Sequence, residues 1–223
     1  NVVDANDLNH ILSGDNQVFK ERTLIGGIQS LRPRRDWRDK NDNELIEADK
    51  LMRLIENREN PEPLFDLLIV DESHHVRNDE SVQHDMVRMF RNVSDQAVFL
   101  SATPIHLKSQ DLFNQLQILD PEQFQNIEEF DEIITANIPI QSARDALINP
   151  KVKLSDIKNH LYEAKRTPIL SNSRSIVTLI EKVNSLKSDR DLSYKFRSEL
   201  ASDLERANLL SNILTRTRRK DVQ

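Results

Sequence analysis

Residues 67–78 read Leu-Leu-Ile-Val-Asp-Glu-Ser-His-His-Val-Arg-Asn, and the predicted fold is built around them. The first four residues are apolar without alternation, and Ile69 and Val70 are β-branched, which is typical of a strand buried on both faces of a parallel sheet. Asp71 and Glu72 follow this strand directly. Because open α/β sheets bind ligands at the carboxyl ends of their strands, the two carboxylates are a candidate site.

The two acidic residues suit nucleotide chemistry. Asp71 is a candidate magnesium ligand through water, since Mg²⁺ prefers a few hard oxygens and keeps most of its hydration shell. Glu72 would then orient or deprotonate the water that attacks a γ-phosphate. The alternative is a strand that simply ends at a solvated helix cap, and an Asp-Glu pair alone does not decide between the two.

A second apolar strand is predicted at residues 98–100, after a turn at 92–96, and it leads into Ser101-Ala102-Thr103-Pro104. Between the two strands, Asp79 and Ser81 can cap a helix whose apolar residues recur at helical spacing from Val82 to Phe90. The order strand, helix, strand predicts a parallel βαβ unit.

In this order and spacing, the motifs resemble the ATPase motor of helicase superfamily two. Residues 71–74 match its second motif, Asp-Glu-x-His, and residues 101–103 match its third. Three further segments are similar to the Swi/Snf-like branch of that superfamily, in which the bacterial polymerase-associated ATPases are nearest in layout. These segments are the threonine-proline turn with the helix Asp-Leu-Phe-Asn-Gln-Leu at 111–116, Ile-Leu-Asp-Pro at 118–121, and the arginine-rich run at 213–222.

The resemblance implies a RecA-like lobe of an ATP-dependent motor that moves along duplex DNA, with ATP and Mg²⁺ as cofactors. It implies that Asp71 is the magnesium carboxylate and Glu72 the catalytic base. Ser73 and His74 complete the second motif. The residues that would link hydrolysis to the grip on nucleic acid are Ser101, Ala102 and Thr103 of the third motif.

Composition narrows the functions that the chain can have. It has 223 residues, a net charge of −6 and no cysteine, which excludes disulfides and cysteine metal sites and disfavours indiscriminate coating of nucleic acid. None of its three glycines precedes a lysine, so it contains no loop of the kind that cradles phosphates. We therefore expect a piece of a longer motor. The apolar runs are too short for a membrane span and no leader opens the chain, which predicts an intracellular protein, cytoplasmic in a bacterium.

Nucleic-acid contacts are predicted in two places. After a strand candidate at residues 23–28, Gln29 and Ser30 stand where the family usually carries a hydroxyl. Arg34, Arg35 and Trp37 form a basic loop with an aromatic residue, which suits phosphates and base stacking. The alternative for this loop is a solvated segment whose Trp37 packs against the domain.

The predicted fold is α/β: a partial RecA-like parallel sheet with helices, followed by a mainly helical insertion. A helix at 44–57 covers the sheet, and helices past residue 121 are expected to break at Pro139, Pro150 and Pro168. Two later helical stripes run over residues 173–186 and 194–214. The predicted domains are 1–121 for the lobe, 122–212 for the insertion and 213–223 for a basic linker towards a second lobe.

Two alternatives accompany this interpretation. One is a catalytically inactive, helicase-like scaffold that binds RNA polymerase or another protein partner. The other is a metal site at His74 and His75, which we disfavour because adjacent side chains diverge in both helices and strands.

Overall fold

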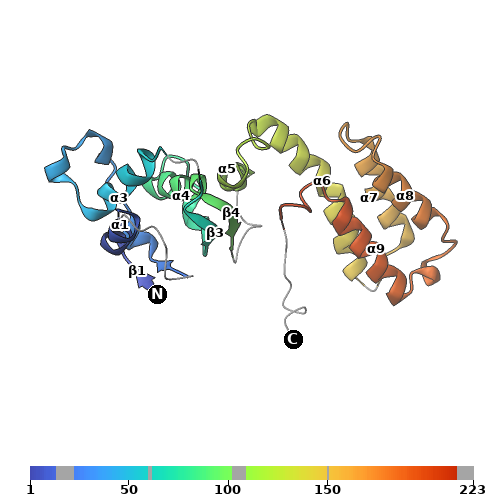
Figure 1. Cartoon of the computed structure of the whole chain (residues 1–223). Coiled ribbons are helices and arrows are strands. Elements are labelled where there is room, and N and C mark those ends of the chain that lie inside the picture. Colours follow the sequence, from blue (N-terminus) through green and yellow to red (C-terminus); the bar gives the residue numbers. More distant parts are fainter. Residues whose placement is uncertain (14–22, 60–61, 102–108, 150, 215–223) are drawn as a thin grey trace. The chain divides into compact units, whose positions relative to one another are not determined.

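The computed structural model describes residues 1–13, 23–59, 62–101, 109–149 and 151–214 (Figure 1). Within these ranges the chain forms two compact units that divide between Gln125 and Asn126. The first unit is α/β and the second is helical, and each has its own hydrophobic core. No helix in the described ranges combines the length and the apolar composition that a membrane crossing requires.

The first unit contains two parallel pairs of strands. In chain order its helices and strands are β1 Val2–Val3, α1 Ala5–Ser13, β2 Ile25–Gly26, α2 Ile28–Leu31, α3 Glu47–Glu56, β3 Phe65–Val70, α4 Val82–Asn92, β4 Ser94–Phe99 and α5 Ser109–Leu119. β1 pairs with β2, and β3 pairs with β4, with Phe65 opposite Ser94 and Val70 opposite Phe99. The predicted parallel strand-helix-strand unit is thus confirmed as β3-α4-β4 (Figure 1).

β4 begins earlier than its sequence predicts. Ser94 and Gln96 were expected in a turn but pair with β3, because ladder hydrogen bonds can recruit polar residues that lack strand propensity. At the amino end of α4, the Ser81 hydroxyl accepts a hydrogen bond from the His84 amide at 3.1 Å, as the capping pattern predicts.

The prediction that β3 is buried on both faces is wrong for this chain. Val70 is 6% exposed and packs in the core with residues of α3 and α4, whereas Leu67 and Ile69 are 47% and 58% exposed. Successive side chains of a strand point to opposite faces, so one face of the β3-β4 pair is covered and the other is open. Val98 of β4 and Leu100, the residue after β4, continue this open apolar face.

α3 follows the predicted apolar spacing and buries Leu51, Met52 and Ile55. It begins at Glu47 rather than Glu44, because residues 42–44 form a separate 3₁₀ turn. A fully buried carboxylate, Asp49, lies among its core residues.

The second unit has no strand in its described residues. Its helices are α6 Ile127–Ile148, α7 Leu154–Arg166, α8 Arg174–Asn184 and α9 Tyr194–Ala207. α6 packs against α7 and α9, and α8 packs against the same two helices, so the four apolar stripes close on a common core (Figure 1).

Proline and asparagine explain two differences from the predicted helices. α6 continues through Pro139, which is buried, because tertiary packing outweighs one missing backbone hydrogen bond. α7 ends before Pro168 as predicted, and Pro150 lies outside the described residues. α9 ends at Ala207 instead of running to 214. Where the chain leaves α9, Asn137 Oδ1 of α6 accepts a hydrogen bond from the Leu209 amide at 3.0 Å.

Candidate active site

The segment from Asp71 to Arg77, called the acidic turn below, lies at the carboxyl edge of the β3-β4 sheet. The Leu100 amide donates to the Val70 carbonyl at 2.8 Å, and the Ser73 amide donates to the Leu100 carbonyl at 2.8 Å. These two bonds close the ends of the strands against each other. They bring Asp71 and Glu72, which follow β3, to the same edge of the sheet as Ser101, which follows β4.

Glu72 has a left-handed backbone conformation, with φ 50° and ψ 46°. It is the one non-glycine residue with positive φ among those described. Such conformations are strained in L-residues and persist where surrounding contacts hold them, often at functional sites. The turn points the Glu72 side chain outward, and it is 52% exposed.

Asp71 is exposed beside Glu72, and its Oδ1 accepts the Glu72 amide at 2.9 Å. Its Oδ2 is not used in any hydrogen bond within the described residues. A single outward carboxylate oxygen fits a magnesium ion that retains most of its water ligands. Across the described ranges, no three side chains of His, Cys, Asp or Glu gather to form a cage for a metal.

His74 and His75 follow on a 3₁₀ turn, Ser73–Val76. Their ring centroids are 4.2 Å apart with a 36° tilt, so the expectation that the rings diverge is wrong. The Cα–Cβ bonds of adjacent residues diverge, but the side-chain torsions bring these rings back together. His74 Nδ1 lies 3.1 Å from Glu72 Oε2, within ion-pair distance, but makes no hydrogen bond.

Ser73 is buried behind the acidic turn. Its hydroxyl donates to Gln115 Oε1 of α5 at 2.9 Å. The neighbouring Asn114 donates from Nδ2 to the Arg77 carbonyl at 2.9 Å. The sequence prediction missed both amides, although two adjacent polar residues between the apolar Phe113 and Leu116 of one helix could have marked them.

Two other predicted segments lie partly or wholly outside the described residues. Ser101 is described and half-buried, but Ala102 and Thr103 are not. The basic residues at 216–220 are also outside the described ranges, so the structure bears on neither the rest of the third motif nor the predicted linker.

A comparison of the sequence with known protein families identifies the family. The chain matches the SNF2-related domain over residues 6–188. The chain belongs to the SNF2-related family. It is therefore a Swi/Snf-like member of helicase superfamily two, as the acidic motif and the segments after it predict.

Individual relatives of this SNF2-related chain are bacterial. The RNA polymerase-associated protein RapA of Histophilus somni (strain 129Pt) is 30% identical over 162 residues, which are 71% of this chain. RapA of Yersinia enterocolitica (serotype O:8, biotype 1B) is 31% identical over 162 residues, and RapA of Yersinia pestis (strain Pestoides F) is 30% identical over the same length. The matched part is 16% of the length of each of these relatives.

The predicted nucleic-acid residues of this SNF2-related chain fall into two groups. Gln29 and Ser30 are exposed on α2, and Arg35 is exposed with one weak bond, 3.4 Å, to the Glu80 carbonyl. Arg34 instead pairs with the buried Asp49 at 2.6 Å, and Trp37 is 3% exposed with Arg38 4.3 Å above its ring. Trp37 thus packs against the domain, as in the alternative for this loop, and the Arg34 guanidinium already has a carboxylate partner.

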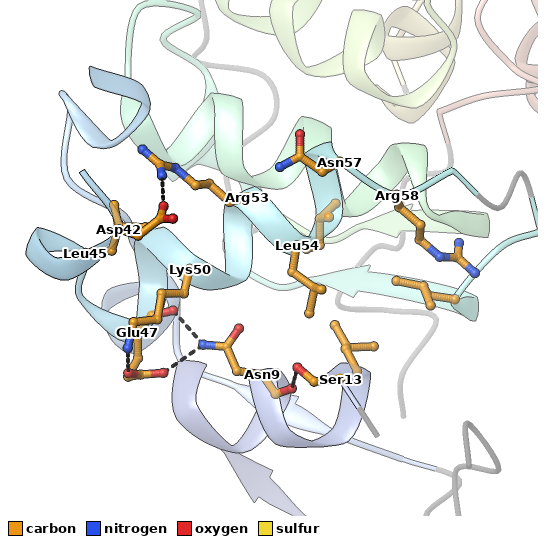
Figure 2. A pocket seen from close by; sticks show the side chains of 13 residues that line it. Asn9, Ser13, Asp42, Leu45, Glu47, Lys50, Arg53, Leu54, Asn57 and Arg58 are labelled. Carbon is orange, nitrogen blue, oxygen red and sulfur yellow. Dashed lines mark hydrogen bonds and ion pairs between the residues drawn. The ribbon is translucent and has the colours of Figure 1, made fainter. Parts of the chain in front are cut away.

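A separate cavity of about 630 Å³ lies between α1 and α3 (Figure 2). Its polar side chains pair with one another: Asn9 donates to Glu47 Oε2 at 3.0 Å, Lys50 contacts Glu47 at 2.6 Å, and Arg53 contacts Asp42 at 2.6 Å. Lys50 and then Asn9 hold the pKa of the Glu47 carboxyl below its ordinary value. None of the predicted site residues lines this cavity.

Proposed function

We propose that the chain supplies the Mg-ATP hydrolysis motif of a Swi/Snf-type motor that uses ATP to move along duplex DNA. The observation that carries this proposal is the acidic turn, in which two exposed carboxylates follow β3 at the carboxyl edge of a parallel sheet. Family membership supports the same chemistry. On this proposal, residues 1–121 belong to the first RecA-like lobe and residues 122–212 to the helical insertion of the motor.

Each residue of the turn has a distinct role in this proposal. Asp71 holds magnesium through water, and the ion, when bound, neutralises charge on the phosphate oxygens. Glu72 accepts the proton of the attacking water or orients it, for which its outward, solvent-exposed side chain is suited. His74, whose Nδ1 lies 3.1 Å from Glu72 Oε2, couples the nucleotide site to the third motif. Ser101 and Thr103 link hydrolysis to nucleic-acid binding.

The partners follow from the family and its relatives. Duplex DNA is the proposed track, with Gln29, Ser30 and Arg35 as the exposed contact candidates. RNA polymerase is the proposed protein partner, because the matched relatives are described as RNA polymerase-associated. With these partners, the proposed location is inside the cell, in the cytoplasm of a bacterium.

The first test is ATP hydrolysis by the polypeptide that carries this chain, with and without duplex DNA. Glu72→Gln should lower the turnover number by a factor of about 100 or more, because the general base is lost, while the dissociation constant for ATP stays within about twofold. Glu80→Gln is the matched control, since Glu80 is also exposed and follows the turn by a few residues. DNA-stimulated turnover that survives Glu72→Gln would contradict the assigned base.

The inactive-scaffold alternative makes the opposite prediction. If neither the wild type nor Glu72→Gln hydrolyses ATP with any nucleic acid, the motor proposal fails. Binding of RNA polymerase that is unaffected by Glu72→Gln would then identify the scaffold as the better description.

The 223-residue chain by itself should hydrolyse ATP at least about 300-fold more slowly than the polypeptide that carries it. The chain has no glycine-lysine phosphate loop. On this proposal, the arginines that complete the site come from the second lobe of the motor. Loss of these positioning and charge-stabilising groups removes on the order of 3–4 kcal/mol of transition-state stabilisation. Single-turnover hydrolysis measured on the purified chain is the check, and a rate within tenfold of the longer polypeptide would refute the expectation.

A further inference from the structure

The backbone of Glu72 needs external support. Its φ of 50° is unusual for a residue with a side chain, and a left-handed conformation relaxes unless neighbouring contacts hold it. The residue before it, Asp71, contributes only an adjacent bond to the Glu72 amide. The stronger restraints come from the residue after it.

Ser73 is 2% exposed and is held by two hydrogen bonds to different elements. Its amide donates to the Leu100 carbonyl, at the end of β4, and its hydroxyl donates to Gln115 Oε1 of α5. With both groups held, a change in the Glu72 backbone that moves Ser73 would break at least one of these bonds. Hydrogen bonds between two buried side chains are a small minority of those in proteins, and leaving one partner unpaired is costly.

The orientation of the Gln115 amide follows from its partners. Its Nε2 donates to the Asp111 carbonyl at 3.2 Å, and a carbonyl can only accept, so the Oε1 atom is the one that faces Ser73. Gln115 itself is 5% exposed. The acceptor for the Ser73 hydroxyl is therefore fixed in place by the backbone of α5.

A second amide of α5 holds the other end of the same turn. Asn114 Nδ2 donates to the Arg77 carbonyl at 2.9 Å, and Asn114 Oδ1 accepts from Gln110 Nε2 at 2.8 Å. Two consecutive residues of α5 thus bind the turn at Ser73, the first residue of the 3₁₀ segment, and at Arg77, directly after its last residue.

We infer that Gln115 is a positioning residue for the Glu72 carboxylate: through the buried Ser73 hydroxyl, α5 holds the backbone conformation that aims the proposed base. This inference rests on the proposed ATPase function. It assigns to α5 a part in the alignment of the acidic turn that the sequence motifs do not indicate.

The test uses the polypeptide that carries this chain. Gln115→Leu removes the acceptor without changing the size of the side chain greatly. Gln117→Leu is its control, because Gln117 lies on the same helix, is half-buried and has a side chain that makes no hydrogen bond within the described residues. We expect kcat to fall about tenfold for Gln115→Leu while the KM for ATP changes less than about twofold, and both to stay unchanged for Gln117→Leu.

Ser73→Ala removes the other partner of the bond. It changes the side chain less, so it replaces Gln115→Leu as the test if that variant fails to fold. It should lower kcat by a similar factor, and the double variant should be no slower than the slower single variant, because both changes break one interaction. Additive losses in the double variant, a normal kcat in Gln115→Leu, or a raised KM with normal kcat would each overturn the inference.

A second measurement does not depend on ATP hydrolysis. Amide hydrogen exchange of the segment 70–77 should be faster in Gln115→Leu than in the wild type and unchanged in Gln117→Leu. Equal exchange in all three proteins would show that Gln115 does not hold the turn. If the wild type hydrolyses no ATP, the proposed function fails separately, and the exchange experiment alone decides whether α5 fixes the Glu72 conformation.

Discussion

The contacts of Asp49 change the interpretation of Arg34, which lies 15 positions earlier in the chain. Its side chain is fully buried and accepts hydrogen bonds from the Arg34 amide at 2.8 Å, from Arg34 Nε at 2.8 Å and from the Ile46 amide at 3.2 Å. A buried carboxylate requires such partners, because the cost of its desolvation is otherwise large. Arg34, a predicted nucleic-acid contact, is therefore occupied in holding the loop against α3.

Asp49→Ala should lower the free energy of unfolding by about 2–3 kcal/mol, less than for a fully buried pair because the Arg34 side chain is 36% exposed. The control is Asp42→Ala, which breaks the pair with Arg53 from an aspartate that is 94% exposed and should cost less than about 1 kcal/mol. Urea unfolding of both variants measures the difference. Equal costs would show that the Asp49 pair is no more than a surface interaction.

At the scale of the element, β3 combines a covered face and an open face on six residues. Val70 packs in the core of the first unit, while Ile69 and Leu67 extend an apolar surface shared with Val98 of β4 and with Leu100, which follows β4. Parallel sheets usually have both faces covered. The open face thus leaves four large apolar side chains 43% to 58% exposed within the described chain.

Two adjacent substitutions test which face of β3 carries stability. Val70→Thr should cost about 1–2 kcal/mol, because it places a hydroxyl in a buried apolar site. Ile69→Thr should cost less than about 0.5 kcal/mol and should raise solubility, since the side chain is already 58% exposed and threonine keeps its β-branch. Urea unfolding and the saturating concentration of each variant provide the check, and a larger loss at Ile69 would show that the open face is covered in solution.

At the scale of the whole molecule, stability comes from two separate cores. The core of the first unit draws on residues between Val3 and Ile118, and the core of the second on residues between Ala136 and Ala207. Leu51 and Leu200 are each 0% exposed in their respective cores. A defect in one core should therefore be felt mainly in the unit to which it belongs.

Leu51→Ala and Leu200→Ala should each destabilise their own unit by about 2–5 kcal/mol, through lost apolar burial and a residual cavity. Peptide-resolved hydrogen exchange should show faster exchange in α3 and α4 for the first variant and in α6 to α9 for the second. Tyr194→Ala, at a side chain that is 89% exposed, is the control and should change neither. Acceleration of both units by one substitution would instead indicate a single cooperative structure.

The sequence by itself determined the strand-helix-strand order around the acidic pair. The apolar runs before Asp71 and before Ser101, the Ser81 cap and the periodic stripes of α3, α8 and α9 all depend on neighbouring residues, so they are readable in a single chain. The acidic pair could likewise be placed at the end of a strand, because a strand end is a local feature. Membership of the SNF2-related family followed from motifs of the same local kind.

Only the tertiary structure decided how these elements constrain one another. The bond from Ser73 to Gln115 joins residues 42 positions apart, and the burial of Asp49 and Trp37 depends on what packs over them. The left-handed conformation of Glu72 is likewise maintained by contacts from β4 and α5 rather than by its own preference. Periodicity indicates which residues share a face of a helix or strand. Contacts between segments distant in the chain decide which element covers that face. The same contacts decide whether a strained backbone conformation, such as that of Glu72, is stabilised.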